Sequence, residues 1–202
     1  IIDHTTASAT VAREMAHLAT EQQAYFIDAP VSGGQAGAEN GVLSIMCGGD
    51  PKAYERALPL LRSYGKSIEH MGASGSGQLS KMVNQICIAG LLQGLSEALA
   101  FGERAQLDMD KVLKVISQGA AGSWQLSNRG STMLERSFDF GFAVDWMRKD
   151  LGLVLEEAKT NGALLPVTAL VDQFYAELQQ MGGERWDTSS LIARLGVPDP
   201  KP

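Results

Sequence analysis

The stretch from Gln78 to Gln106 constrains the fold of this chain more than any other feature. It contains no proline, and its glycines lie only at positions 90, 94 and 102, so one continuous helix can form. At ~1.5 Å per residue such a helix would be roughly 40 Å long. Apolar residues cover most of its circumference, which is typical of a helix buried inside a larger assembly.

The character of the chain changes near residue 75. Before that point we expect helices over 8–23 and 51–63 to alternate with strands over 25–31, 42–47 and 67–71. Beyond it we expect only helices, over 78–106, 109–118, 125–135, 145–160, 166–180 and 189–195, and then a frayed tail. The predicted fold class is therefore an α/β fragment over 1–75, followed by an all-α C-terminal domain over 76–202 with one long helix.

The start of the chain also bears on its organisation. Ile1-Ile2-Asp3 has the character of the end of a strand, and natural domains seldom begin within an element. We therefore expect the chain to be a fragment whose upstream part is missing. No signal peptide is expected either, since the first residues form neither a basic leader nor a long apolar run.

Composition excludes several classes of protein. With 45% hydrophobic and 20% charged residues, the 202-residue chain can bury a core and is not a disordered segment. The formal net charge of -6 argues against non-specific binding of nucleic acid. Charges interrupt the apolar residues every few positions, so we expect no membrane-spanning segment of ~20 residues.

Cysteines and histidines show no metal-binding spacing. Cys47 and Cys87 lie far apart in apolar surroundings, and we expect two buried free thiols of a cytoplasmic protein rather than a disulfide. His4, His17 and His70 form neither an HxxxH nor an HExxH pair, so no metal site is predicted.

A serine and two glycines follow the strand predicted over 25–31. Ser32 supplies a hydroxyl group, and Gly33 and Gly34 supply backbone N–H groups that a ligand can approach closely. Consecutive N–H groups in such a turn form a concave site suited to a carboxylate. The alternative is a tight turn between two strands with no binding role.

A second glycine-rich segment, from Gly72 to Gly77, precedes the long helix. Glycines ahead of a helix N-terminus can hold an anionic group with help from the helix dipole. However, the pattern is not GxGxxG, and no acidic residue follows at the spacing that a dinucleotide fold needs. A flexible, closely packed junction is the favoured interpretation.

Lys81 and Asn84 lie near the start of the long helix, three residues apart and hence on one face. Gln78 and Gln85 fall on the same side. A lysine among apolar neighbours has little structural reason to be there, and desolvation makes such a lysine a usable acid or base by lowering its pKa. The alternative is a surface lysine whose ammonium group reaches water.

Two residues of the helical half are further candidates. Lys149 lies at the start of the helix predicted over 145–160, where a cation opposes the helix dipole, a placement that function can justify. Its alternative is a surface ion pair with Asp145 or Asp150. Trp124 could line a substrate pocket, although a place in the core is the favoured interpretation.

Five segments in order resemble the β-hydroxyacid dehydrogenase family, which includes 3-hydroxyisobutyrate dehydrogenase and tartronate semialdehyde reductase. They are IIDHTTAS at 1–8, DAPVSGG at 28–34, GVLSIMCGGD at 41–50, GASGSGQLSKMVNQ at 72–85 and RKDLGL at 148–153. The second is similar to the family's substrate-binding motif, and the fourth to its catalytic signature G-x-x-G-x-G-x-x-x-K-x-x-N. The resemblance covers nearly the whole chain and implies that residues 1–75 are the end of a Rossmann-like domain.

The resemblance also implies roles for the residues that match. Lys81 would be the general acid or base, and Asn84 would orient the substrate. The substrate carboxylate would lie on Ser32, Gly33 and Gly34, with Trp124 as a further substrate-binding candidate. The residues implied to contact the cofactor, NAD or NADP, are Thr6, Gly77 and Lys149.

Further expectations concern partners and cofactor. The family implies a small hydroxyacid substrate and a homodimer or homotetramer formed through the helical domain. The family's GxGxxG turn has no counterpart in these 202 residues, so we expect the chain alone to bind a nicotinamide cofactor poorly. The same absence leaves the choice between NAD and NADP open.

Other functions remain open. A ligand-binding or oligomerisation module without catalysis is one alternative, and an imine or succinic semialdehyde reductase of the same superfamily is another. Because Asn84 follows Lys81 without the His-Asn pair of the 6-phosphogluconate branch, a small three- or four-carbon acid is the favoured substrate. A Schiff-base lysine generally lies at the end of a barrel strand, which disfavours that chemistry here.

Overall fold

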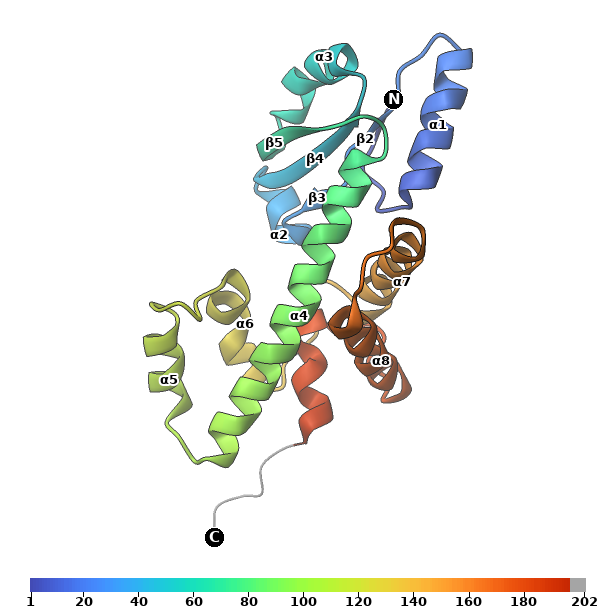
Figure 1. The fold of residues 1–202 in the computed structure, drawn as a ribbon. Helices are drawn as coiled ribbons and strands as arrows, with labels where there is room; N and C mark the ends of the chain where they lie inside the picture. The colour runs from blue at the N-terminus through green and yellow to red at the C-terminus, as the bar shows by residue number, and fades with distance from the viewer. Residues whose placement is uncertain (197–202) are drawn as a thin grey trace. The chain divides into compact units, whose positions relative to one another are not determined.

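The computed structural model describes residues 1–196, which form two compact units (Figure 1). The first unit comprises Ile1–Gln85 together with Glu156–Gly162. The second comprises Ile86–Leu155 and the chain from Ala163 onward. The first unit holds the sheet and the second is helical, which confirms the predicted fold class of an α/β part followed by a helical part with one long helix. The predicted frayed tail lies outside the described residues.

The first unit is built around one mixed sheet. Its strands are β1 (Ile2–Asp3), β2 (Ile27–Asp28), β3 (Val31–Ser32), β4 (Leu43–Gly49) and β5 (Gly65–Gly72). The central strand β4 pairs antiparallel with both β2 and β3 and parallel with β5, and β1 pairs parallel with β2. The single strand predicted over 25–31 is thus two short strands. Pro30 lies between them, and proline has no N–H to donate to a ladder.

Three helices lie entirely within the first unit: α1 (Ala9–Glu21), α2 (Gly34–Glu39) and α3 (Pro51–Leu61). The predicted cap of α3 is confirmed, because the Asp50 side chain accepts a hydrogen bond from the Ala53 N–H and Pro51 is the first helical residue. The short helix α2 was not predicted. Its sequence GQAGAE is glycine-rich, and residues with weak helix propensity give little periodic signal.

The core of this unit lies between the sheet and α3. Its fully or nearly fully buried members come from β2 and the residue that follows it, from β4 and from α3, and are Ile27, Ala29, Leu43, Ile45, Cys47, Ala53 and Leu61. Burial, together with the nearby Asp28, raises the pKa of the Cys47 thiol to about 11. Cys47 and Cys87 are both free, as predicted, but Cys87 is exposed on its helix, so the prediction that it is buried was wrong.

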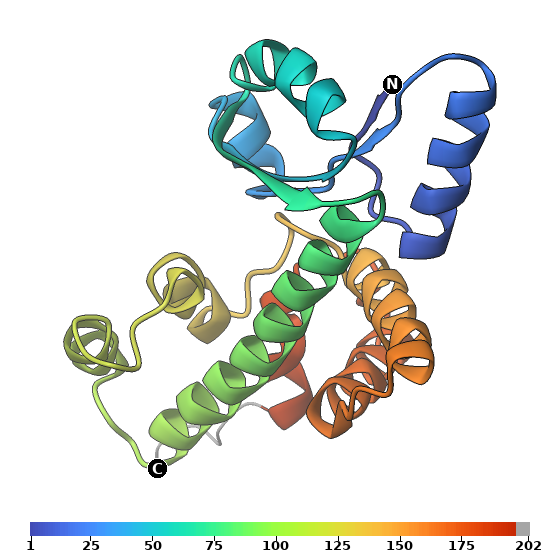
Figure 2. The same ribbon diagram turned by 45° about the horizontal axis from the view of Figure 1, so that its top comes forward.

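The long helix α4 (Ser76–Arg104) is continuous, as predicted (Figure 2). By length and composition alone this helix meets the criterion for a membrane-spanning segment. From the sequence we expected no segment that meets it. A buried core helix meets the same criterion. Several polar residues of α4 are buried, Gln78, Gln85, Gln93 and Ser96 among them, and α4 contributes Leu92 and Leu99 to two apolar clusters.

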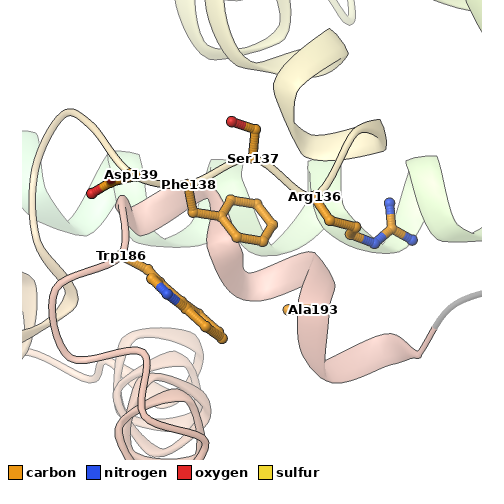
Figure 3. A pocket seen from close by; sticks show the side chains of 6 residues that line it. All are labelled: Arg136, Ser137, Phe138, Asp139, Trp186 and Ala193. Carbon is orange, nitrogen blue, oxygen red and sulfur yellow. The ribbon is translucent and has the colours of Figure 1, made fainter.

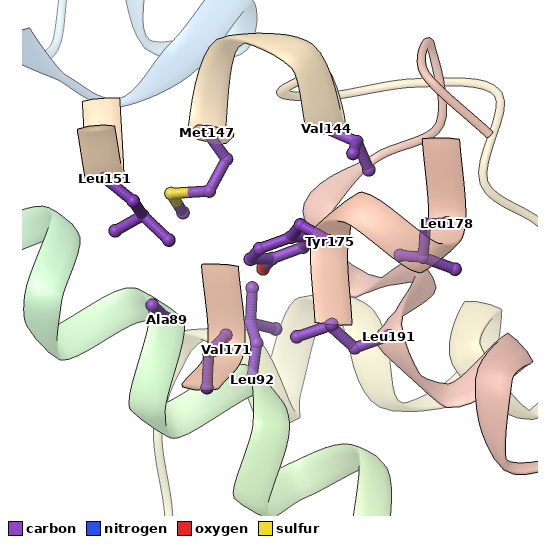
Figure 4. Packing of buried hydrophobic residues seen from close by; sticks show 9 residues of the cluster. All are labelled: Ala89, Leu92, Val144, Met147, Leu151, Val171, Tyr175, Leu178 and Leu191. Carbon is purple, nitrogen blue, oxygen red and sulfur yellow. The ribbon is translucent and has the colours of Figure 1, made fainter. Parts of the chain in front are cut away.

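The second unit packs the middle of α4 against further helices. These are α5 (Met109–Ile116), α6 (Trp124–Leu134), α7 (Val144–Asn161), α8 (Pro166–Gln180) and the 3₁₀ segment η1 (Thr188–Leu195). Figure 4 shows the main cluster, in which α4, α7, α8 and η1 meet around Ala89, Leu92, Val144, Met147, Leu151, Val171, Tyr175, Leu178 and Leu191. The predicted last helix is therefore of the 3₁₀ type. Tyr175 is fully buried, and its hydroxyl donates to the Thr188 carbonyl at 3.1 Å.

Candidate active site

Two segments that leave parallel strands are joined to each other in the first unit. After β1, the Asp3 carboxylate accepts from the Thr5 N–H at 3.0 Å and from its hydroxyl at 2.7 Å, which shapes the turn that carries Thr6. His4 bonds through Nδ1 to the Ala29 carbonyl oxygen at 2.6 Å, just after β2. Because a carbonyl only accepts, Nδ1 carries the proton in that bond. The predicted cofactor segment and the start of the predicted substrate motif are thereby fixed to each other.

The Ser32–Gly34 turn has the conformation that glycine allows. Gly33 and Gly34 have φ of +130° and +60°, and both are exposed, while Ser32 is half-buried in β3. A Cβ built on Gly34 would meet no heavy atom within 4 Å. The backbone of this turn is therefore accessible to a ligand. Its predicted role as a carboxylate site stays a prediction.

A buried carboxylate holds the start of α4. Asp28, at the end of β2, is fully buried and accepts from the Gly75 N–H at 2.8 Å and from the Gln78 N–H at 3.0 Å. Burial raises the pKa of this carboxyl, and the N–H groups that it accepts from oppose the rise. The protein's own carboxylate thus takes the position where the sequence allowed an anionic ligand.

The glycines around Asp28 explain why this junction is closely packed. A Cβ on Gly48 would lie 2.6 Å from Asp28 Oδ1, and one on Gly77 would lie 2.6 Å from the Asp28 carbonyl oxygen and collide with that of Met46. The favoured interpretation of the glycine-rich segment as a packed junction is therefore confirmed. Gly77 is needed there for packing, and its predicted contact with a cofactor stays a prediction.

Gln78 connects the first turn of α4 with the segment after β1. Its side-chain Oε1 accepts from the Ala7 N–H at 3.0 Å, and its Nε2 donates to the Thr5 carbonyl oxygen at 2.8 Å. The side chain is buried, so these two bonds face no competition from water. The half-buried Thr6 lies in the turn that they hold.

Lys81 follows one helical turn later and is only 7% exposed. The alternative of a surface lysine was therefore wrong. Asn84 is half-buried, and its Nδ2 donates to Oε1 of the buried Gln85 at 2.8 Å. An amine and two amides thus lie along the start of α4, the arrangement that the sequence predicted for this face.

The other two predicted site residues belong to the second unit. Lys149 is half-exposed and forms an ion pair with Asp150 at 3.0 Å, which was one of the alternatives. Trp124 begins α6 and is 60% exposed, so the favoured prediction that it belongs to the core was wrong. The Arg129 guanidinium lies over its ring at 4.9 Å and over that of Phe140 at 4.8 Å.

The second unit also contains a pocket that no predicted site residue lines (Figure 3). Its walls are Arg136, Ser137, Phe138, Asp139, Trp186 and Ala193. Arg136 is engaged elsewhere, because its guanidinium pairs with Glu103 at 2.7 Å and donates to the Met133 carbonyl oxygen at 2.9 Å. Among residues 1–196 no group of three or more histidine, cysteine, aspartate or glutamate side chains could hold a metal ion.

Sequence reasoning missed the functions of Asp28 and Gln78 in building the site. Asp28 stands in the DAPVSGG segment, yet its partners Gly75 and Gln78 lie 47 and 50 residues further along. Such pairings are not encoded in local spacing. The available signal for Gln78 was its place one turn before Lys81 on the same helix face.

Two family models together match nearly the whole chain. Residues 1–72 match a model described as the NAD binding domain of 6-phosphogluconate dehydrogenase. Residues 75–195 match a model described as NAD-binding of NADP-dependent 3-hydroxyisobutyrate dehydrogenase.

Individual relatives are also similar to this chain over nearly its whole length. An uncharacterized oxidoreductase of Shewanella frigidimarina is 60% identical over 195 residues, which are 96% of this chain and 67% of that protein. The 2-hydroxy-3-oxopropionate reductase of Escherichia coli is 37% identical, with the same two shares. The solved structure of Mycobacterium tuberculosis 3-hydroxyisobutyrate dehydrogenase with L-serine has a TM-score of 0.86 at 31% identity, over 97% of this chain and 69% of that one. The chain spans about two thirds of the length of these proteins.

Proposed function

This chain belongs to the β-hydroxyacid dehydrogenase family, of the 3-hydroxyisobutyrate dehydrogenase type, and from that premise we propose that the protein interconverts a small β-hydroxyacid and its semialdehyde or keto form with NAD or NADP. The observation that carries the proposal is the burial of Lys81 at the start of a helix whose first turn is bonded to both neighbouring strand ends. A lysine in that place has the surroundings of a reactive group rather than of a solubilising one.

The residues present suit one end of a dinucleotide. The segment after β1 carries the half-buried hydroxyl side chain of Thr6, a group that can form hydrogen bonds with the carboxamide and the ribose hydroxyls at the nicotinamide end. The turn ahead of α4 does not suit a pyrophosphate, because its Gly75 and Gln78 N–H groups are bonded to Asp28. The proposed cofactor contacts in the first unit are therefore those around Thr6.

Lys81 is the proposed proton-transfer group. When the alcohol is oxidised, its neutral amine accepts the hydroxyl proton, and the ammonium form returns that proton to the carbonyl oxygen in the reverse direction. A nicotinamide cofactor, when bound, would supply or accept the hydride at carbon. General acid–base catalysis of this kind is typically worth about 10²–10⁴-fold. Asn84, held by Gln85, is proposed to orient the reacting oxygen beside the amine.

The proposed substrate class combines a carboxylate with a primary or secondary alcohol on the β carbon. The exposed glycine turn at Ser32–Gly34 supports a carboxylate contact, because its backbone is open to a ligand. The names of the relatives agree with this class: one is a 2-hydroxy-3-oxopropionate reductase, and the solved structure contains L-serine. Both compounds are three-carbon acids.

The test is turnover by the full-length protein that contains this chain. We expect NAD(P)H production with at least one of 3-hydroxyisobutyrate, L-serine and glycerate. Lys81→Ala should lower kcat by at least about 100-fold, because it removes the proton acceptor. The control is Lys114→Ala, which removes an exposed lysine of α5 and should leave kcat unchanged. Near-normal kcat in Lys81→Ala would remove this lysine from the mechanism.

The same experiment distinguishes a non-catalytic module. Such a protein would bind hydroxyacids at the Ser32–Gly34 turn, detected by calorimetry, without reducing either cofactor. It would also tolerate Lys81→Ala with unchanged affinity.

A further inference from the structure

We propose that Gln78 is a positioning residue, which ties the Thr5–Ala7 turn to the helical turn that carries Lys81 and thereby sets the reaction rate. This inference rests on the proposed function, in which the nicotinamide lies beside that turn and Lys81 transfers the proton. Neither part of the proposed function assigns a role to Gln78.

The contacts of the side chain show how the tie is made. Gln78 uses its amide oxygen to accept from Ala7 N and its amide nitrogen to donate to Thr5 O, at 3.0 and 2.8 Å. One bond of each polarity, to residues on either side of Thr6, fixes both the position and the orientation of the turn. Gln78 is only 1% exposed, so water does not compete for these two bonds.

The backbone of the same residue is anchored independently. Its N–H donates to the Asp28 carboxylate at 3.0 Å, next to the bond from Gly75 at 2.8 Å. Gln78 is therefore bonded to the end of β2 through its main chain and to the segment after β1 through its side chain. The helix then carries this placement to Lys81, which lies three residues on, about 4.5 Å further along the axis.

Such an arrangement matters for hydride transfer because two groups must be placed at once. The carbon that exchanges hydride and the oxygen that exchanges a proton belong to one substrate, so the cofactor turn and the lysine must keep a fixed separation. A misplacement of about 1 Å can cost about 10²-fold in rate. A purely structural glutamine would affect stability without affecting the chemical step in this way.

The first variant is Gln78→Met, which keeps the length of the side chain and removes both hydrogen bonds. We expect kcat to fall about 10- to 100-fold. The KM for the hydroxyacid should stay nearly constant, since its carboxylate contacts are proposed to lie at Ser32–Gly34. The matched control is Gln93→Met. It replaces another buried glutamine of α4, whose side-chain Nε2 donates to Glu97 at 2.6 Å, and it should leave kcat unchanged.

The second variant, Gln78→Glu, gives a pH-dependent readout. A protonated carboxyl can still accept from Ala7 and donate to the Thr5 carbonyl, whereas an ionised one places an oxygen anion against that carbonyl. We therefore expect the loss of kcat relative to wild type to deepen as pH rises. A loss that is independent of pH would overturn the proposed hydrogen-bond role.

Hydrogen exchange tests the tie without turnover. In Gln78→Met the Ala7 amide should exchange faster than in wild type, while the Gly75 amide, which is bonded to Asp28, should not change. Unchanged exchange at Ala7 in Gln78→Met would overturn the inference. Faster exchange together with a normal kcat in Gln78→Met would also overturn it, provided that Lys81→Ala inactivates the enzyme. If Lys81→Ala retains kcat, the proposed role of Lys81 in proton transfer fails, and if the wild type shows no turnover, the proposed function fails. In either case the exchange result alone then decides whether Gln78 holds the turn.

Discussion

Asp28 and Lys81 show how much burial determines the role of a single residue. Both carry groups that water would normally solvate, and both are nearly inaccessible. Asp28 is stabilised by two backbone N–H groups at the start of α4, a place where a helix favours negative charge. It therefore serves the structure, and the lysine one turn beyond Gln78 is left as the proposed chemical group.

The raised pKa of Asp28 predicts a specific pH dependence of stability. Burial favours the protonated form in the folded state, so the contribution of Asp28 is fully present at low pH. It is lost as pH rises above the ordinary value of 3.8 and through the raised folded value. The free energy of unfolding of wild type, measured relative to Asp28→Asn by urea denaturation, should therefore decrease as pH rises.

The control for this prediction is Asp139→Asn, which changes an exposed carboxylate in the second unit. Its stability relative to wild type should show no comparable trend. A difference between wild type and Asp28→Asn that stays constant with pH would show that Asp28 titrates normally in the fold.

At the scale of elements, the junction between β4, β2 and α4 depends on the absence of side chains. The backbone of α4 at Gly77 lies against the carbonyl oxygens of Asp28 and Met46, so that helix and strands approach more closely than any other residue would allow. This approach places the Gln78 N–H within hydrogen-bond distance of Asp28.

Gly77→Ala should therefore destabilise the protein by about 1–3 kcal/mol, because the added methyl group meets backbone atoms that cannot move independently. The matched control is Gly152→Ala in α7, where a Cβ would meet no heavy atom within 4 Å. That change should stabilise the protein by about 0.5–1 kcal/mol, because alanine favours the helix. Equal urea midpoints for the two variants would contradict the packing argument.

Helices were easier to predict from the sequence than the pairing of strands or the exposure of individual side chains. The long helix, the cap of α3 and α8 follow from periodicity and local capping chemistry, which act within a few residues. The division of β2 from β3 depends on pairing with β4, which local patterns do not report. Similarly, the exposure of Cys87 and Trp124 depends on which neighbours cover them, so both predictions were wrong.

The candidate site shows the same limit. Lys81 and the Ser32–Gly34 turn were found through the resemblance, since their residues alone left a surface lysine and a plain turn open. The bonds that hold Lys81 in place join residues 47 to 73 positions apart. Such long-range bonds can be identified only in the folded structure.

At the scale of the whole molecule, one face of α4 remains exposed in the second unit. Its members recur at intervals of three or four residues, so they form a stripe along one side of the helix. They are Cys87, Leu91, Gly94, Ala98 and Phe101. Phe101 is 73% exposed. Small and apolar residues at this spacing are typical of a helix that packs against another helix, and on this ground we propose that the homodimer or homotetramer expected from the family resemblance forms through this face.

Leu91→Asp should therefore lower the sedimentation coefficient of the protein toward that of a monomer, since it would bury an unpaired charge in the interface. Leu95 is unsuitable for this test because it packs against the cluster around Leu99 and Met133, so its replacement would also disturb the core. The control is Val115→Asp, which places the same charge on the exposed side of α5. Unchanged sedimentation of Leu91→Asp, at a concentration where wild type is oligomeric, would show that this face of α4 is not the interface.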